Sequence, residues 1–395
     1  MQVRIPAVYM RVGSSKAVFF HENHLPRDPE IRDSVILAAY GSPDPNRRQI
    51  DGMGGAVSTT SKAAIISPSK DPDFDVNYTF GQVAIDKPMI DYQGNCGNIS
   101  SAVGPFAIDE GLVNVEEPVT RVRIFQTNTK KLIIAEVPVQ NRLHQIEGDY
   151  KVDGVPGTGA RITLHFFDPG GSVTGKLLPT GNVKDTIEVP GIGRFTVSIV
   201  DAANPVVFVR AEELGLKVTE IAEIDAGVEI REKLEAIRSG AAVMIGLAST
   251  PGEATDRSQA VPKIAFISKP QSYKAVDGKI IREEEIDITA RIMSMGTLHK
   301  AYALTGAICT TGAARIDETI VNELVRKSAL KKKEIRLGHP GGIIPIEPEV
   351  ENRGNTFEYI KAAAGRTARR LMEGYVYVPQ KYFHKLECGL STLVP

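Results

Sequence analysis

The amino-acid sequence predicts an α+β fold in which sheets wrap around a few helices. Short runs rich in Val, Ile, Phe and Tyr, bounded by Gly, Pro, Asp or Asn, outnumber the segments with helical periodicity. The helical segments do not alternate regularly with these runs, as they would in a doubly wound nucleotide-binding fold. With 395 residues, the chain is long enough for two domains that each bury a core.

The expected strands and helices follow from these local patterns. Strand-like composition is found at 3–11, 16–20, 62–67, 76–85, 121–129, 131–139, 161–167 and 194–202, and later at 263–270, 358–365 and 373–379. Apolar residues at helical spacing predict helices at 30–40, 99–111, 229–239 and, with the strongest signal, 283–304.

The chain also divides into two similar halves. In the first half, strands lead to the turn GNCGN (94–98) and then to an apolar helical run. In the second half, strands lead to the small-residue segment TGAICTTGAARI (305–316). The Gly/Pro/Thr-rich stretch 168–183 is the predicted junction. We therefore expect domains at 1–183 and 184–369, with the C-terminal segment 370–395 returning to the first domain.

Composition excludes several classes of protein. A net charge of -1 gives no electrostatic reason to expect nucleic acid or an anionic membrane as a partner. Cys96, Cys309 and Cys388 lie far apart without a CxxC pair, so neither a disulfide framework nor a metal site is expected. No stretch approaches the roughly 20 apolar residues that span a bilayer. We expect a cytoplasmic protein.

The turn GNCGN (94–98) is the first candidate site. A turn of this kind before a helix leaves backbone N–H groups without intrahelical acceptors, and the helix dipole favours an anion there. The same position favours the thiolate form of Cys96. The alternative is a buried cysteine that caps the helix, because cysteine is among the most buried residue types.

Two Ser-Lys dipeptides supply candidate bases, one in GSSK (13–16) and one in STTSK (58–62). Lys62 lies between a hydroxyl cluster and the apolar run AAII, and desolvation there would lower its pKa toward that of a general base. The alternative is a lysine that extends from a strand end to solvent. The preceding Gly/Pro-rich loop, 41–56, is longer than most connections and indicates a functional segment.

The second half offers weaker candidates. His299 follows a helical run, His339 lies in the glycine-rich segment RLGHPGG, and TTGAAR (310–315) is predicted to form another anion-accepting turn. Each histidine alone fits a structural role as well. The sequence contains no HExxH, GxxxxGK[ST] or GxSxG motif, so metal-dependent hydrolysis, P-loop phosphate binding and a serine nucleophile elbow are not indicated.

Motifs along almost the whole chain resemble those of one known enzyme family. They include GSPDPNRRQIDGMGGAVSTTSKAAIISPS (41–69), GNCGNISSAVGPFAI (94–108), PKIAFISKP (262–270), RLGHPGG (336–342) and RRLMEGYVYVP (369–379). The family is that of 3-methylitaconate isomerases and 2-methylaconitate cis-trans isomerases, which also contains 4-oxalomesaconate tautomerases and aconitate isomerases. The resemblance covers residues 3–379. It implies the fold of diaminopimelate epimerase, with two pseudo-symmetric domains, each a sheet wrapped around a central helix, and an active site in the cleft between them.

The resemblance also implies roles for single residues. It assigns proton transfer to Lys62 and an active-site thiol to Cys96. The implied substrate-binding residues are Ser15, Lys16, Ser61, Asn95, Gly97 and Asn98 from the first domain, with His299, Thr310, Thr311, Gly312 and His339 from the second. Epimerases of this fold carry a second cysteine in a Cys-Gly-Thr-Gly turn, whereas Cys309 is followed by Thr-Thr-Gly. This departure argues against a symmetric two-thiol racemisation.

The implied activity is a cofactor-independent movement of a double bond in a small unsaturated di- or tricarboxylate. An allylic 1,3-proton shift or cis-trans isomerisation needs a base, an acid and fixed dipoles. The candidate lysine, cysteine and anion-accepting turns named above can supply all three. Cys96 would be a second acid/base or a positioning group, and one-base and two-base versions stay open.

Two other functions and the assembly state complete the expectations. The same fold supports an amino-acid epimerase or racemase, and a catalytically silent protein could use it to bind polycarboxylates. We expect a homo-oligomer, either a dimer or a tetramer.

Overall fold

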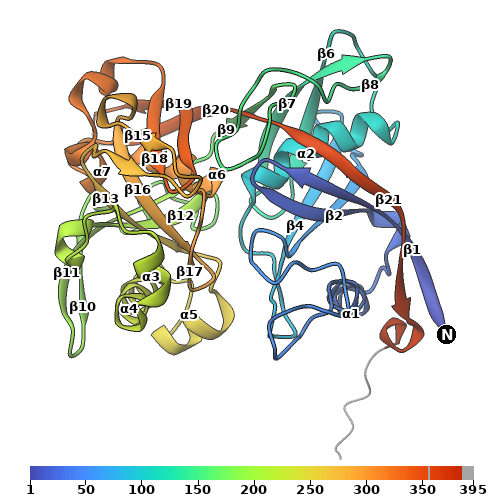
Figure 1. Ribbon diagram of the computed structural model, residues 1–395, viewed down its shortest axis with the longest axis horizontal. Coiled ribbons are helices and arrows are strands. Elements are labelled where there is room, and N and C mark those ends of the chain that lie inside the picture. Colours follow the sequence, from blue (N-terminus) through green and yellow to red (C-terminus); the bar gives the residue numbers. More distant parts are fainter. Residues whose placement is uncertain (355, 385–395) are drawn as a thin grey trace, which may run out of the picture.

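Two lobes lie side by side in the computed structural model, which describes residues 1–354 and 356–384 (Figure 1). The first lobe contains strands β1 (Gln2–Val12), β2 (Ser15–His21), β3 (Lys62–Pro68), β4 (Val76–Val83), β5 (Ile90–Asp91), β6 (Val119–Gln126), β7 (Lys131–Gln140), β8 (Leu143–His144), β9 (Ile162–Phe167) and β21 (Ala368–Pro379), with helices α1 (Pro29–Tyr40) and α2 (Gly97–Asp109).

The second lobe has a similar set of elements. Its strands are β10 (Asp185–Val189), β11 (Gly193–Ala202), β12 (Asn204–Arg210), β13 (Lys263–Ser268), β14 (Tyr273–Lys274), β15 (Ile280–Ile281), β16 (Ile288–Ser294), β17 (Thr297–Leu298), β18 (Ile335–His339), β19 (Gly342–Asn352) and β20 (Phe357–Arg366). Its helices are α3 (Ala222–Ala226), α4 (Val228–Met244), α5 (Pro251–Arg257), α6 (Leu304–Ala313) and α7 (Ile320–Leu324).

The two lobes repeat one strand topology. In the first, β2 runs parallel to β3, β3 antiparallel to β4, and β4 parallel to β6. In the second, β12 runs parallel to β13, β13 antiparallel to β16, and β16 parallel to β18. A short strand and a central helix, α2 or α6, precede the last strand of each series. The predicted α+β class is therefore confirmed, and the chain is built of two similar halves.

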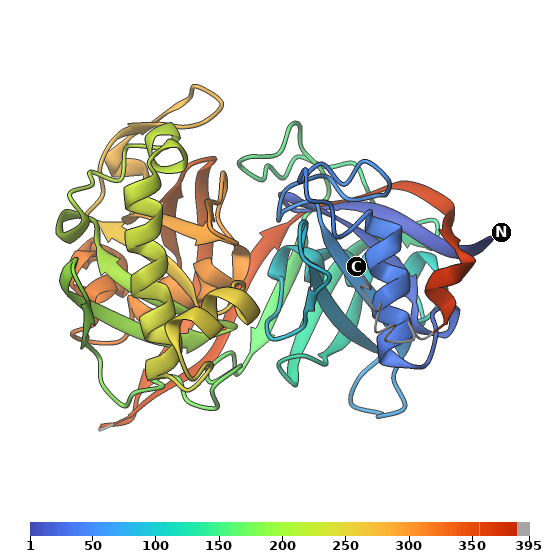
Figure 2. The ribbon, with the colours of Figure 1, turned by 90° about the horizontal axis from the view of Figure 1, so that it is seen from below.

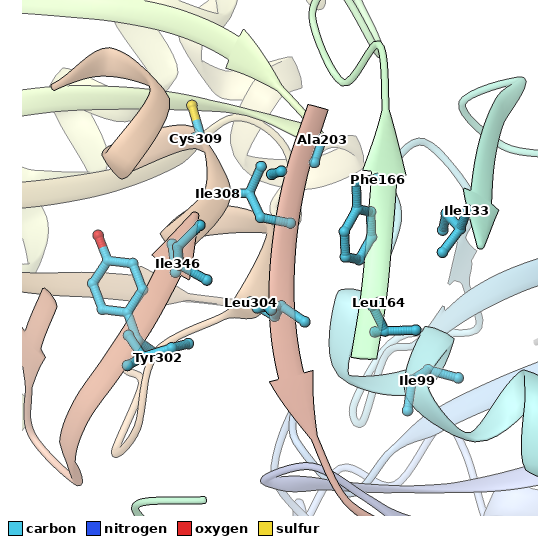
Figure 3. Packing of buried hydrophobic residues seen from close by; sticks show 14 of the residues in the cluster. Ile99, Ile133, Leu164, Phe166, Ala203, Tyr302, Leu304, Ile308, Cys309 and Ile346 are labelled. Carbon is cyan, nitrogen blue, oxygen red and sulfur yellow. The ribbon is translucent and has the colours of Figure 1, made fainter. Parts of the chain in front are cut away.

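Each lobe wraps its sheet around one buried helix and carries another helix outside. All ten residues of α6 are buried, as are residues 97–108 of α2. Both helices consist mainly of apolar and small residues, as expected of helices enclosed by a core, and their apolar side chains pack between the strands (Figure 3). In contrast, α1 and α4 lie on the outer face of their lobes (Figure 2).

The chain returns to the first lobe near its C-terminus. Strand β20 pairs with β19 of the second lobe and with β9 of the first, and β21 then pairs with β1 from residue 368 to 379. The predicted junction, 168–183, falls between β9 and β10. The domain limits 1–183 and 184–369 stay predictions, and residues 385–395 of the returning segment lie outside the described residues.

The strongest helix prediction, 283–304, is wrong. Residues 288–294 form β16, whose seven residues are all buried between β13 and β18, and the helix α6 begins only at Leu304. A strand buried on both faces need not alternate apolar and polar residues, so periodicity cannot distinguish it from a buried helix. The three other predicted helices are confirmed as α1, α2 and α4.

Candidate active site

A pocket lies between the lobes, at the N-terminal ends of α2 and α6 and the first residues of β3 and β13. Its polar and charged lining residues are Ser15, Lys62, Gln82, Asp91, Asn95, Cys96, Asn98, Asn204, Lys263, Ser294, His299 and Thr305. This is the interlobe position that the family resemblance implies for an active site. The pocket brings together Lys62 and Cys96, the two residues that the sequence singled out for proton transfer.

Two helix N-termini meet at this pocket. Cys96 is the N-cap residue of α2 and Ala303 is that of α6. The helices start so close together that a Cβ on Gly97 would lie 3.0 Å from the side chain of Leu304. First-turn N–H groups have no intrahelical acceptor, and both helix dipoles present their positive ends here. The pocket is therefore suited to carboxylate groups.

The second lobe contributes no thiol to the pocket. The position that corresponds to Cys96 at the start of α6 is occupied by Ala303, whereas Cys309 lies further along the helix. Its Sγ donates to the carbonyl oxygen of Val200 at 3.2 Å, and burial raises the pKa of Cys309. In Figure 3, Cys309 lies on the side of α6 away from Ile99 of the first lobe. Among the residues that the structure describes, Cys96 is the one thiol that lines this pocket.

The predicted anion-accepting turn at 310–315 is also wrong, because residues 310–313 belong to α6. The hydroxyls of Thr310 and Thr311 donate to carbonyl oxygens one turn earlier, at 2.7 and 2.9 Å. Gly312 packs against Tyr359, and a Cβ there would lie 2.1 Å from the ring. The small residues permit close packing of a buried helix, so Thr310, Thr311 and Gly312 lie outside the pocket.

Lys62 has the environment that its sequence context predicts. It is the first residue of β3, 6% exposed, and its Nζ donates to the Oε1 atom of Gln82 and lies 5.2 Å from the centroid of the Phe80 ring. Burial lowers the pKa of Lys62, while the charge of Cys96 opposes this shift. A lysine with a lowered pKa and a place in a pocket is a candidate general base.

His299 lines the pocket and His339 does not. The Nδ1 atom of His299 accepts the N–H of Ala301 at 3.1 Å, which leaves the proton of the neutral ring on Nε2. Burial, together with the charge of Lys62, lowers the pKa of His299 to about 3, so the ring is neutral at physiological pH. His339 makes a similar contact with the N–H of Gly341 at 3.1 Å, and burial lowers its pKa too.

Three of the first-lobe candidates face the pocket with polar atoms. The buried Oγ atom of Ser15 has no hydrogen-bond partner in the part of the chain that the structure describes. Asn95 donates its N–H to the Oδ1 atom of Asn204 at 3.0 Å. Asn98 accepts from Nε of Arg366 at 3.1 Å, which fixes its side chain beside the start of α2. Asn95 and Asn98 are therefore already hydrogen-bonded within the protein, whereas the hydroxyl of Ser15 is free to bind a ligand directly.

Lys16 and Ser61 lie outside the pocket. Lys16 follows Ser15 in β2 and therefore points to the opposite face of the sheet, where its Nζ lies 5.5 Å from the ring centroid of Tyr9. Ser61 is fully buried and donates to Oε1 of Gln49 at 2.7 Å, which anchors the long loop 41–61. Ser61 thus fixes the loop immediately before Lys62 and does not itself contact the pocket.

Sequence reasoning missed several residues that line the pocket, among them Gln82, Asp91, Asn204, Lys263, Ser294 and Thr305. Lys263 had a usable signal, because KIAFIS (263–268) matches the pattern of KAAIIS (62–67). Asp91 is the one carboxylate among the described lining residues, and burial raises its pKa. The buried Lys62, the half-buried Lys263 and two helix N-termini therefore leave the pocket with an excess of positive potential.

Asn204 joins the two helix N-termini across the lobes. Its Nδ2 donates to the carbonyl oxygen of Asn95 at 2.9 Å and to Oγ1 of Thr305 at 3.1 Å, and its Oδ1 accepts from Asn95. We expect Asn204→Ala to lower the free energy of unfolding by about 1–3 kcal/mol, because it leaves buried polar groups of Asn95 unpaired. It should also raise the KM for substrate. Urea denaturation and steady-state kinetics measure both effects.

The matched control for this prediction is Asn182→Ala. Asn182 is exposed and donates to Asp185 within one loop, so the free energy of unfolding should change by no more than about 0.5 kcal/mol. An Asn204→Ala protein as stable as the control would show that the amide does not hold the two lobes together.

Residues 1–354 and 356–384 contain no group of three or more His, Cys, Asp or Glu side chains arranged to hold a metal ion. No helix among them combines the length and the apolar character needed to cross a membrane.

Known proteins resemble this chain over nearly its full length. The 3-methylitaconate isomerase of Eubacterium barkeri is 49% identical over 379 residues, which cover 95% of this chain and 98% of that protein. The 2-methyl-aconitate isomerase of Shewanella oneidensis is 42% identical over 391 residues, covering 96% of this chain and 98% of that protein.

Solved structures support the same relationship. The crystal structure of a methylitaconate-delta-isomerase has a TM-score of 0.77 at 48% identity and covers 97% of both chains. A hydroxyproline epimerase from Agrobacterium vitis has a TM-score of 0.55 at 12% identity, covers 96% of this chain and 94% of its own, and shares the fold. The epimerase-like α+β fold is thus confirmed. Because the family model described as "PrpF protein" matches residues 2–379, the chain belongs to the PrpF protein family.

Proposed function

We propose that the protein is a cofactor-independent isomerase that moves a double bond in a small unsaturated di- or tricarboxylate, such as 3-methylitaconate, 2-methylaconitate or aconitate. The observation that carries this proposal is the buried amine of Lys62 in a pocket closed by two helix N-termini. The names of the two relatives above support the same class of reaction. Their different substrates leave the substituent on the carbon skeleton open, because a pocket discriminates a methylene by only about 1–3 kcal/mol.

The chemistry follows from the groups that line the pocket. A double bond moves when a base removes a proton from the carbon beside it and an acid returns a proton to the far carbon. Negative charge then spreads from the carbon skeleton into a neighbouring carboxylate. The N–H groups at the starts of α2 and α6 can hold that carboxylate and stabilise the developing charge. Lys62 is the proposed base, and Cys96 is a second acid/base or a positioning group.

An amino-acid epimerase or racemase is the nearer alternative. Such an enzyme would place two thiols on opposite faces of a substrate carbon. The residues after Cys309 already depart from the epimerase pattern for the second thiol. Here Ala303 stands where α6 would present a second thiol, which favours the isomerase. A silent polycarboxylate-binding protein would need only a charged ammonium group at Lys62, whereas a pKa lowered by burial is what a proton-transferring base needs.

Proton NMR of the purified protein in D₂O tests the proposed function. The panel contains 3-methylitaconate, 2-methylaconitate, cis- and trans-aconitate and 4-oxalomesaconate. We expect deuterium incorporation and a shifted double bond with at least one of them. Conversion of diaminopimelate, proline or hydroxyproline in a chiral assay would instead support the epimerase. Tight binding of the polycarboxylates without any exchange would support the silent protein.

A further inference from the structure

Lys263 is the counterpart of Lys62 in the second lobe. Each lysine opens a strand that runs parallel to one neighbour and antiparallel to the other, β3 between β2 and β4, and β13 between β12 and β16. The two segments, KAAIIS and KIAFIS, match in pattern. Both side chains line the same pocket. The two-lobe repeat therefore places one amine from each lobe in this pocket.

The surroundings of Lys263 hold it in place without neutralising it fully. Its Nζ donates to the carbonyl oxygen of Ala260 at 3.0 Å. The charges of Cys96 and, to a smaller extent, Asp91, both from the other lobe, oppose the lowering of its pKa, and the buried Oδ2 atom of Asp91 has no hydrogen-bond partner among the described residues. An amine with a single carbonyl partner in a pocket remains available to a ligand.

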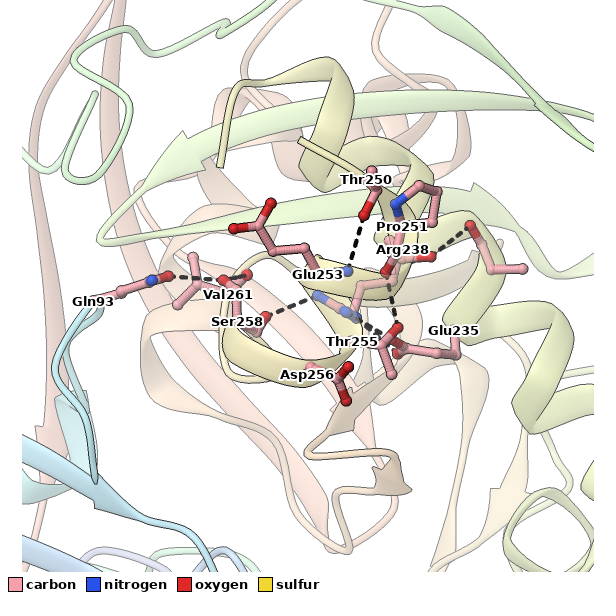
Figure 4. Close-up of polar contacts among 12 residues, drawn as sticks. Gln93, Glu235, Arg238, Thr250, Pro251, Glu253, Thr255, Asp256, Ser258 and Val261 are labelled. Atoms are coloured by element: carbon pink, nitrogen blue, oxygen red, sulfur yellow. Dashed lines mark hydrogen bonds and ion pairs between the residues drawn. The ribbon is translucent and has the colours of Figure 1, made fainter. Parts of the chain in front are cut away.

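The loop that leads into Lys263 is tied to the first lobe. The Oγ atom of Ser258 donates to Oε1 of Gln93 at 2.7 Å, and Arg238 donates to the carbonyl oxygen of Ser258 at 2.9 Å (Figure 4). Arg238 is itself fixed by an ion pair of 2.6 Å with Glu235. This network presents Lys263 at a defined position across the cleft from Lys62, as proton transfer requires.

The protonation of the two amines is coupled. Burial, followed in size by the charge of Lys62, lowers the pKa of Lys263 to about 8. Two ammonium groups in one pocket repel each other, so protonation of one amine disfavours protonation of the other. A two-base proton shift needs one neutral amine and one ammonium group at its start.

We propose that Lys263 is a second catalytic residue, which transfers a proton from the lobe opposite Lys62. The inference rests on the proposed isomerase function and deepens it. It selects a two-base mechanism in which both proton carriers are amines.

Atoms and charges balance in this step. The neutral amine takes a proton from the saturated carbon, and the electron pair of that C–H bond forms the new double bond. The π pair of the old double bond moves to the far carbon. There it binds the proton released from the N–H bond of the ammonium group. One lysine has then gained a proton and the other has lost one, and exchange with water restores both.

The test compares variants of the full chain on whichever panel substrate the wild type isomerises. Lys263→Met keeps the length of the side chain and removes the amine, and we expect kcat to fall at least about 100-fold. Lys263→Arg keeps the positive charge but cannot release its proton near neutral pH, so it should stay at least about 10-fold below the wild type in kcat. Methylamine should partly restore Lys263→Ala and leave the wild type unchanged.

The matched control is Lys269→Met, which alters an exposed lysine just beyond the other end of β13 and should keep full activity. Binding of a saturated tricarboxylate, measured by calorimetry, checks that each variant is folded. A Lys263→Arg protein with wild-type kcat, or a Lys263→Met protein that changes only in KM, would reduce Lys263 to a carboxylate anchor and overturn the inference. A wild-type protein that exchanges no proton with any panel substrate would refute the proposed function itself.

Discussion

Lys62→Ala should lower the rate of isomerisation by about 10²- to 10⁴-fold, the usual contribution of a positioned general base. Deuterium incorporation from D₂O should fall with it, because proton removal precedes every later step. Lys62 is 6% exposed, lines the interlobe pocket and has a pKa lowered by burial. NMR in D₂O and a steady-state assay with the same substrate measure both rates.

Lys16→Ala is the matched control, since both lysines follow a serine at the start of a strand. The side chain of Lys16 lies over Tyr9 on the other face of the sheet, so this variant should keep wild-type rates. Cys96→Ser gives the second comparison. If Cys96 transfers no proton, the isomerisation rate of the Cys96→Ser protein stays at the wild-type value, and the thiol is structural. Near wild-type isomerisation and exchange by Lys62→Ala would show that the lysine assignment is wrong.

Gly312→Ala should destabilise the fold strongly while leaving the pocket chemistry untouched in whatever protein remains folded. A Cβ at Gly312 would lie 2.1 Å from Cε1 of Tyr359, and both residues are buried. Tyr359 cannot easily move, because its hydroxyl donates to the carbonyl oxygen of Ile308 at 2.9 Å. Overpacking of this kind costs about 1–3 kcal/mol, occasionally more. Urea denaturation measures the free energy of unfolding.

Gly252→Ala, in the short helix α5, is the control for this prediction. The nearest atom to a Cβ there is Oγ1 of Thr250 at 4.0 Å, so alanine should be neutral or slightly stabilising in a helix. The sequence-based hypothesis made Gly312 a substrate-binding residue. A Gly312→Ala protein with normal stability and a raised KM would return it to that role.

Local patterns were sufficient to identify the first-lobe half of the candidate site. Lys62 is the first residue of an apolar strand, and Cys96 lies in a Gly/Asn turn directly before an apolar helix. Both features depend on neighbours in sequence, because strand ends and helix starts have their own residue preferences. The structure keeps both residues where these preferences put them.

The second-lobe half could not be predicted in the same way. All residues of β16, including Thr289 and Arg291, and all residues of α6 are buried, so neither segment has the exposed polar face that separates strand from helix. Periodicity therefore predicts a helix that ends at residue 304, where α6 begins, and a turn at 310–315, although residues 310–313 belong to α6. With α6 unrecognised, nothing in the sequence marks Ala303 as the counterpart of Cys96, and Cys309 is compared with it instead.

The sequence by itself determined the α+β class, the two similar halves, the family resemblance and the choice of Lys62 and Cys96 as candidate site residues. Only the tertiary structure decided which groups of the second lobe meet them. Lys263, Asn204 and Asp91 reach the pocket because two lobes close on each other through β20 and the contacts of Asn204. These contacts depend on pairing between segments more than a hundred residues apart, and no local sequence pattern predicts which distant segments pair.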